Sequence, residues 1–197
     1  MPVAAGAVTG LVVAFGYYDR LLRPLAHTFG PWILLAVVAS AGQAPRRAAL
    51  RTSTALFTAI VAFHLGQRVI YRIHYAGDAY AFSASSLALW CLLALAAGMV
   101  LGPVFARIGR ADWAGSAAAA SAIGLLAADV HLRTHNYPDE SATLLTFAVL
   151  AVIIILILGA VSRRQVIRTA LLIVPCAVLS YLLLSTPLLE LVPGISR

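Results

Sequence analysis

Apolar residues fill seven stretches of this chain, and short polar or glycine- and proline-containing breaks separate them. The stretches predict helices over residues 3–22, 31–43, 48–75, 81–106, 113–133, 138–161 and 166–184. A helix needs about 20 apolar residues to cross the hydrocarbon core of a bilayer, and all but the second stretch approach that length. The short second stretch predicts a re-entrant or tilted segment. The pattern therefore predicts an all-α fold, one bundle of about seven transmembrane helices over residues 1–197.

Composition supports a membrane protein, because 62% of the residues are hydrophobic and only 11% are charged. The mean hydropathy of +0.95 lies outside the range of ordinary soluble domains. Every basic side chain is arginine, and alanine and leucine dominate, which indicates a bacterial genome rich in G and C. The first stretch lacks a basic leader and predicts a membrane helix rather than a signal peptide. We therefore expect a multi-pass protein of the bacterial cell membrane.

The charged residues divide between the two ends of the predicted helices. The breaks after the second, fourth and sixth helices carry Arg46, Arg47, Arg51, Arg107, Arg110, Arg163, Arg164 and Arg168 against one acid, Asp112. Such clusters mark cytoplasmic loops, so we expect the N-terminus on that side and no nucleic-acid partner. All five histidines and the remaining acids lie toward the opposite end. This division predicts a cavity open to the non-cytoplasmic side, walled by the ends of the first, third, fourth and fifth helices.

The most polar stretch, residues 64–78, closes the third predicted helix. At 100° per residue, one helical face gathers its polar and aromatic side chains. The members of this face that we expect to bind a substrate are His64, Arg68, Tyr71, Arg72 and Tyr75, joined by Tyr18 and Trp90 from other helices. The alternatives are a water-exposed helix end and an interfacial aromatic belt. On the fourth helix, Gly98 and Gly102 form a G-x-x-x-G pair that predicts close approach of a neighbouring helix.

Asp129 is the most informative acid, because it lies about one turn inside the end of the fifth predicted helix. An ionisable group at that depth is costly and usually functional. In a dry cavity its carboxyl group would stay protonated, which predicts a proton donor, with Asp19 and Asp78 as second choices. The alternative is that Asp129 pairs with Arg133, four residues later, and finishes the helix at the interface.

The sequence contains no recognisable motif for metal binding or redox chemistry. His131 and His135 have the spacing of ligands on one helix, but no glutamate lies between them as in a zinc protease. Cys91 and Cys176 stand in separate apolar stretches and form no C-x-x-C pair. There is also no D-D-x-x-D sequence and no glycine-rich phosphate loop. We therefore expect no metal and no cofactor.

Three short motifs suggest a relationship to known proteins: L-A-L-W ending at Trp90, G-P-V-F beginning at Gly102, and A-A-D ending at Asp129. With the seven short helices, they resemble a family of small actinobacterial multi-pass membrane proteins. The chain also resembles the bacterial membrane-bound terpene cyclases of indole-sesquiterpenoid (drimentine-type) biosynthesis. Such cyclases protonate a prenyl chain attached to an aromatic or diketopiperazine head, and they need no metal. The resemblance implies that Asp129 is the catalytic acid and that the substrate is a farnesylated, indole-type molecule.

Three functions follow as hypotheses. The first is a cyclase, in which Asp129 protonates the terminal olefin, aromatic rings shield the cations and the polar face orients the head group. The second is a transporter or lipid-binding membrane protein that recognises an anionic amphiphile with the same face. The third is a structural or accessory subunit without chemistry. The partners expected from the first two are a hydrophobic prenylated small molecule and membrane lipid.

Overall fold

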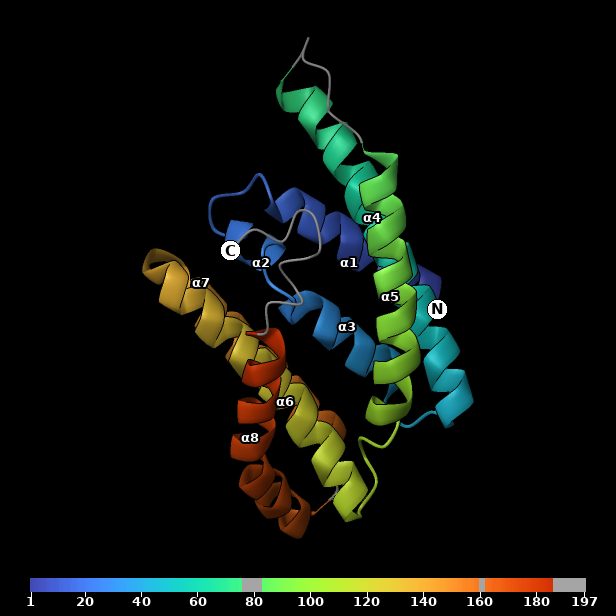
Figure 1. The fold of residues 1–197 in the computed structure, drawn as a ribbon, viewed down its shortest axis with the longest axis vertical. Coiled ribbons are helices and arrows are strands. Elements are labelled where there is room, and N and C mark those ends of the chain that lie inside the picture. Colours follow the sequence, from blue (N-terminus) through green and yellow to red (C-terminus); the bar gives the residue numbers. More distant parts are fainter. Residues whose placement is uncertain (76–82, 160–161, 186–197) are drawn as a thin grey trace.

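The computed structural model describes residues 1–75, 83–159 and 162–185, which form helices without a β-strand in that part of the chain (Figure 1). In chain order the elements are α1 (Pro2–Gly16), α2 (Arg23–Ala26), α3 (Gly30–Ser40), α4 (Pro45–His74), α5 (Ala84–Phe105), α6 (Trp113–Asn136), the 3-10 turn η1 (Pro138–Glu140), α7 (Ser141–Gly159) and α8 (Arg163–Leu184). The predicted all-helical class is confirmed.

Five helices, α4 to α8, are long and apolar enough to cross a membrane, with η1 extending α7. The chain is therefore an integral membrane protein by the length and composition of its helices. The helices α1 and α3 are apolar but shorter, with 15 and 11 residues. The first predicted helix ends at Gly16 and not at residue 22, because Asp19 accepts hydrogen bonds from the N–H groups of Leu21 and Leu22 and closes a turn.

Glycines let α4 approach α5 closely, as the G-x-x-x-G pair predicts. A Cβ atom added to Gly98 would meet the backbone of Ser53, and one added to Gly102 would lie 2.8 Å from the Cα atom of Ala49. The hydroxyl of Ser53 also donates a hydrogen bond to the carbonyl oxygen of Leu95, at 3.2 Å. The prediction that Gly98 and Gly102 line a tight helix contact is confirmed.

A second tight contact joins α1 to α4, and sequence analysis did not find it. Gly6 and Gly10 of α1 are buried, and a Cβ atom on either would fall on the carbonyl oxygen of Ala55 or Ala59. These glycines also have the G-x-x-x-G spacing. The signal was therefore present in the sequence, within a segment rich in glycine and alanine.

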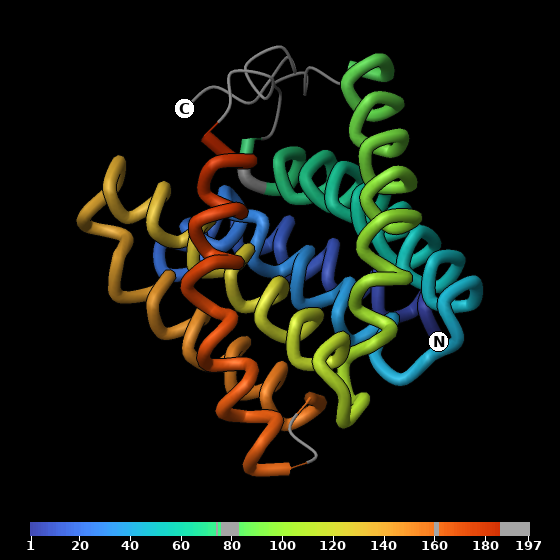
Figure 2. Tube along the Cα trace, turned by 60° about the horizontal axis from the view of Figure 1, so that its bottom comes forward, coloured from blue at the N-terminus to red at the C-terminus, as the bar shows by residue number. Residues whose placement is uncertain are grey.

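The helices pack in two groups, with α3 between them (Figures 1 and 2). In the first group α4 packs against α1 and α5, and in the second α6 packs against α7 and α8, whereas α5 and α6 touch little. The short helix α3 contacts α4 and α5 on one side and α6 and α7 on the other. Most of its residues are buried, Ala36 and Val37 completely, so α3 lies in the core of the bundle.

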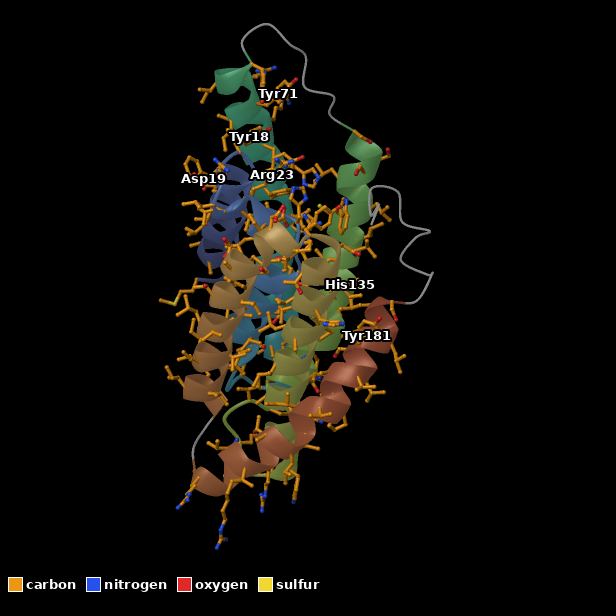
Figure 3. All side chains as sticks on the ribbon, turned by 90° about the vertical axis from the view of Figure 1, so that its left-hand side faces the viewer. Tyr18, Asp19, Arg23, Tyr71, His135 and Tyr181 are labelled. Atoms are coloured by element: carbon orange, nitrogen blue, oxygen red, sulfur yellow. The ribbon has the colours of Figure 1, made fainter. Side chains whose placement is uncertain are left out.

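The two ends of the molecule differ in chemistry. At one end, here called the arginine end, lie the starts of α4 and α8 and the turn between α5 and α6 (Figure 1). Buried Gln165 joins α8 to the turn between α5 and α6 at this end, because its Nε2 atom donates a hydrogen bond to the carbonyl oxygen of Arg110 at 2.7 Å. At the other end, here called the tyrosine end, Figure 3 shows Tyr18, Asp19 and Arg23 near the end of α4, which carries Tyr71.

Candidate functional site

A polar hollow of about 590 Å³ lies at the tyrosine end, and we call it the polar cup. The turn over residues 17–24 forms one wall, and Tyr75 of α4 and the η1–α7 junction form the others. Its charged and aromatic lining comprises Tyr17, Tyr18, Asp19, Arg20, Arg23, Tyr75, Asp139 and Glu140. Both signs of charge therefore face one hollow, beside three tyrosine rings.

Three residues expected at a substrate site, Tyr18, Asp19 and Tyr75, come together in the polar cup. The Tyr18 ring meets the Tyr17 ring edge-on at 5.3 Å between centroids, and the Tyr71 and Tyr75 rings lie 4.9 Å apart. Asp19 holds the turn through the backbone N–H groups of residues 21 and 22. Its observed bonds are therefore structural, and they fix the shape of the cup wall.

An ion-pair cluster adjoins the polar cup. The Nε atom of Arg133 lies 3.1 Å from Oε2 of Glu140, and its guanidinium group covers the Tyr137 ring at 3.8 Å from the centroid. The alternative, an ion pair between Asp129 and Arg133, is therefore not found among the described residues, because Arg133 pairs with Glu140. Partial burial, followed by the positive charges of Arg133 and Arg23, lowers the pKa of nearby His27, whereas Glu140 acts in the opposite direction.

An apolar groove of about 600 Å³ runs along α1, α3 and α7. Its lining includes Val8, Val12, Leu34, Val38 and Phe147. It ends at the same turn that walls the polar cup, because its remaining lining includes Gly16, Leu22 and Leu25. Sequence analysis missed this groove, since helices distant in sequence form it and no single helix shows it as a pattern.

Asp129 lies in the interior of the bundle, apart from both hollows, and is only 7% exposed. The backbone N–H groups of Phe29 and Gly30, where α3 begins, approach its carboxyl group as donors. Its Oδ2 atom is buried and has no hydrogen-bond partner among the residues that the structure describes. The acid singled out by the sequence therefore faces the start of a short, buried helix.

A small aromatic hollow of about 130 Å³, here called the tryptophan slot, lies where α3 meets α4 and α5. Phe29, Trp32 and Trp90 contribute its aromatic rings. Phe63 links the slot to His64, because its ring lies 6.0 Å from the Trp32 ring and 5.5 Å from the His64 ring. Phe29 thus gives its side chain to the slot and its N–H group to Asp129.

The remaining predicted residues lie elsewhere. Nδ1 of His64 is 2.9 Å from the carbonyl oxygen of Ile60, while Arg68 and Arg72 are exposed near the end of α4. Asp78 lies outside the described residues. The predicted substrate-binding face is thus divided among the polar cup, the tryptophan slot and the helix surface. Within the described ranges, no three His, Cys, Asp or Glu side chains gather as metal ligands would.

Fold and site together define an α-helical integral membrane protein with a buried acid, an apolar groove and a polar cup at one end. Comparison of the chain with protein-family models, with curated proteins and with solved structures finds no match. The hollows and the residues around them are therefore the features that bear on function.

Proposed function

We propose that the protein binds a single-chain amphiphile, with the apolar chain in the groove and the head group in the polar cup. The observation that carries this proposal is that an apolar groove of about 600 Å³ and a polar cup of about 590 Å³ end at one turn, residues 16–25. Small-molecule sites commonly occupy about 300–1,000 Å³. Each hollow is thus of a size that suits one end of such a molecule.

The head group provides the selectivity. An apolar chain that moves from the bilayer into the groove exchanges lipid contacts for similar protein contacts and gains little. In the cup, by contrast, Arg20 and Arg23 suit an anionic oxygen, and the faces of Tyr17, Tyr18 and Tyr75 suit a cation. This arrangement supports the lipid-binding hypothesis, with an anionic group as one part of the head.

The topology that accompanies this proposal places the arginine end in the cytoplasm of a bacterial cell. The N-terminus of α1 is then cytoplasmic, and α1 and α3 complete the seven-helix arrangement as two short members. The polar cup opens on the non-cytoplasmic side, where its ligand arrives from the outer leaflet. Labelling of single cysteines at Arg47 and Asp139 tests this topology, and modification of both from one side contradicts it.

Photo-cross-linking tests the amphiphile. The probe is a lysophosphatidylcholine with a diazirine in its acyl chain, added to the purified protein in nanodiscs. We expect labelled peptides from α1 and α3, and we expect Val12→Trp, which fills the groove, to reduce labelling about 10-fold, as a loss of roughly 1.4 kcal/mol in affinity would. The matched control is Val174→Trp on α8, because Val12 and Val174 are 57% and 68% exposed. The proposal is contradicted if α8 is labelled as strongly as α1 and α3, or if labelling is equal in the two variants.

A second candidate, the terpene cyclase, is supported by the buried Oδ2 atom of Asp129 and the aromatic rings of the tryptophan slot. A protonated carboxyl would give its proton to the terminal olefin of a farnesyl group, and the ring would close on the resulting tertiary cation. Loss of a proton from the cyclised cation then restores the acid, so the product has unchanged mass. The slot, at about 130 Å³, must open to admit a farnesyl chain, and for this reason the cyclase comes second.

Incubation of protein-containing membranes with a 3-farnesylated indole tests the second candidate. A cyclase gives a ring-closed isomer of the substrate, and Asp129→Asn abolishes turnover while substrate binding persists. The absence of product with several prenylated indoles contradicts the cyclase and leaves the amphiphile proposal unaffected.

A further inference from the structure

The short helix α3 joins the two helix groups, and its first turn is held from the second group. It contacts α1, α4 and α5 of the first group and α6 and α7 of the second, whereas α5 and α6 touch little. Any change in how α3 is attached to α6 therefore changes how the groups are attached to each other.

The start of α3 needs hydrogen-bond acceptors from elsewhere. The first N–H groups of a helix have no partner inside it, and buried ones must be satisfied by other means. Phe29 at the N-cap position offers no side-chain acceptor, and Gly30 and Pro31 are buried. The carboxyl group of Asp129, on α6, is what these N–H groups face.

Asp129 itself is incompletely satisfied in this arrangement. Its ionised form is favoured by the positive end of α3, but its Oδ2 atom is buried without a partner among the described residues. Its protonated form would place a donor in the same position, again without an acceptor, and would weaken the attraction to the N–H groups of α3. The attraction between Asp129 and the start of α3 is therefore stronger when Asp129 is ionised and weaker when it is protonated.

The charged and titratable groups near this site come from few elements. Arg133 lies one turn along α6, Glu140 lies on η1, and His27 and Arg23 precede α3. The sequences of α3 and α7 contain no ionisable side chain, and α5 contributes only Cys91. On α4, His64 is turned to the carbonyl oxygen of its own helix. On α8, which packs against α6, Tyr181 lies beside His131 of α6, with 5.7 Å between their ring centroids.

We propose that Asp129 is a proton-binding site that controls the attachment of α3 to α6. When Asp129 is ionised, it holds the N–H groups at the start of α3 and keeps the two helix groups together. When it binds a proton, α3 is released from α6 and the groups separate at the tyrosine end. Because α3 also lines the apolar groove, proton binding and amphiphile binding affect each other reciprocally, and this last step rests on the proposed function.

Two measurements on the whole protein in nanodiscs test this inference. The first is difference infrared spectroscopy, which detects the C=O stretch of a protonated carboxylic acid. The second is the distance distribution between spin labels at Val69 on α4 and Leu145 on α7, both more than half exposed. The labels are introduced as Val69→Cys and Leu145→Cys after Cys91 and Cys176 have been replaced by alanine.

When the pH is lowered from about 8 to about 3, a range that includes the ordinary titration of an aspartic acid, we expect a buried carboxylic-acid band to appear and a longer label distance to become populated. In Asp129→Asn the band is absent, and the longer distance is populated at both pH values. The matched control His27→Gln keeps both pH-dependent changes, because Asp129 is still present. A wild-type protein without the band, or an Asp129→Asn variant that keeps the pH-dependent distance change, overturns the inference.

The infrared measurement needs only the wild-type protein and remains informative if Asp129→Asn fails to fold. Addition of lysophosphatidylcholine separates the two proposals. If the pH-dependent changes occur and the lipid neither binds nor shifts them, Asp129 is a proton site and the amphiphile proposal is wrong. If the lipid binds and no pH-dependent change occurs, the amphiphile proposal stands and the proton site is wrong.

Discussion

The contact between α4 and α5 gives the sharpest test of the packing, through Gly98→Ala. The added Cβ atom would meet the Cα and N atoms of Ser53 and would lie 2.6 Å from its Oγ atom. Backbone atoms cannot rotate away, so the two helices must separate. Overpacking of this kind costs about 1–3 kcal/mol. Strain on the hydrogen bond from Ser53 to the carbonyl oxygen of Leu95 costs about 1 kcal/mol more. This second cost is offset by the gain of roughly 0.5–1 kcal/mol that comes from replacing a glycine inside a helix.

The matched control for Gly98→Ala is Gly159→Ala at the end of α7. Gly159 is also buried, but an added Cβ atom there would lie 3.5 Å from Ala119 and Ile108, at an ordinary contact distance. We expect Gly98→Ala to lower the free energy of unfolding by about 1–3 kcal/mol. We expect Gly159→Ala to leave it unchanged or raise it by about 0.5 kcal/mol.

Reversible unfolding in mixed SDS and dodecyl maltoside micelles, followed by circular dichroism, measures both variants of this pair. In thermal unfolding the loss corresponds to about 2–4 °C for each kcal/mol in a chain of this size. Equal stability of wild type and Gly98→Ala, or equal losses in the two variants, would refute the close approach of α4 and α5.

Three further predictions concern the two ends of the molecule. Gln165→Leu leaves the carbonyl oxygen of Arg110 without its buried donor, and we expect a loss of about 1–3 kcal/mol in the same unfolding assay. A double-mutant cycle with Arg133→Gln and Glu140→Gln should give a coupling energy of about 1 kcal/mol that decreases with salt, and a value near zero contradicts the ion pair. Partial burial and Arg133 lower the pKa of His27 below its ordinary 6.5, so the unfolded state binds more protons. The free energy of unfolding should fall as pH drops below about 6.5, and His27→Gln should reduce this slope.

Local patterns in the sequence determined the membrane class, the helices and the division of charge between two ends. These properties depend on residues close together in the chain: apolar length sets a span, and arginine-rich breaks set the ends. The contact glycines Gly98 and Gly102 were also predictable, because their spacing repeats on one face of one helix. Asp129 was found for the same reason, as an ionisable group inside an apolar segment.

Only the tertiary structure decided what these residues contact. Asp129 faces backbone N–H groups at the start of α3, and a backbone group has no residue identity that a sequence pattern could reveal. Arg133 pairs with Glu140 and not with Asp129, because the chain reverses between them at η1. The groove and the cup depend on how α1 and α7 lie against α3, which the sequence of no single helix determines. The sequence by itself thus determined which segments are helical and apolar, and the packing of distant segments decided where the hollows and the surroundings of Asp129 lie.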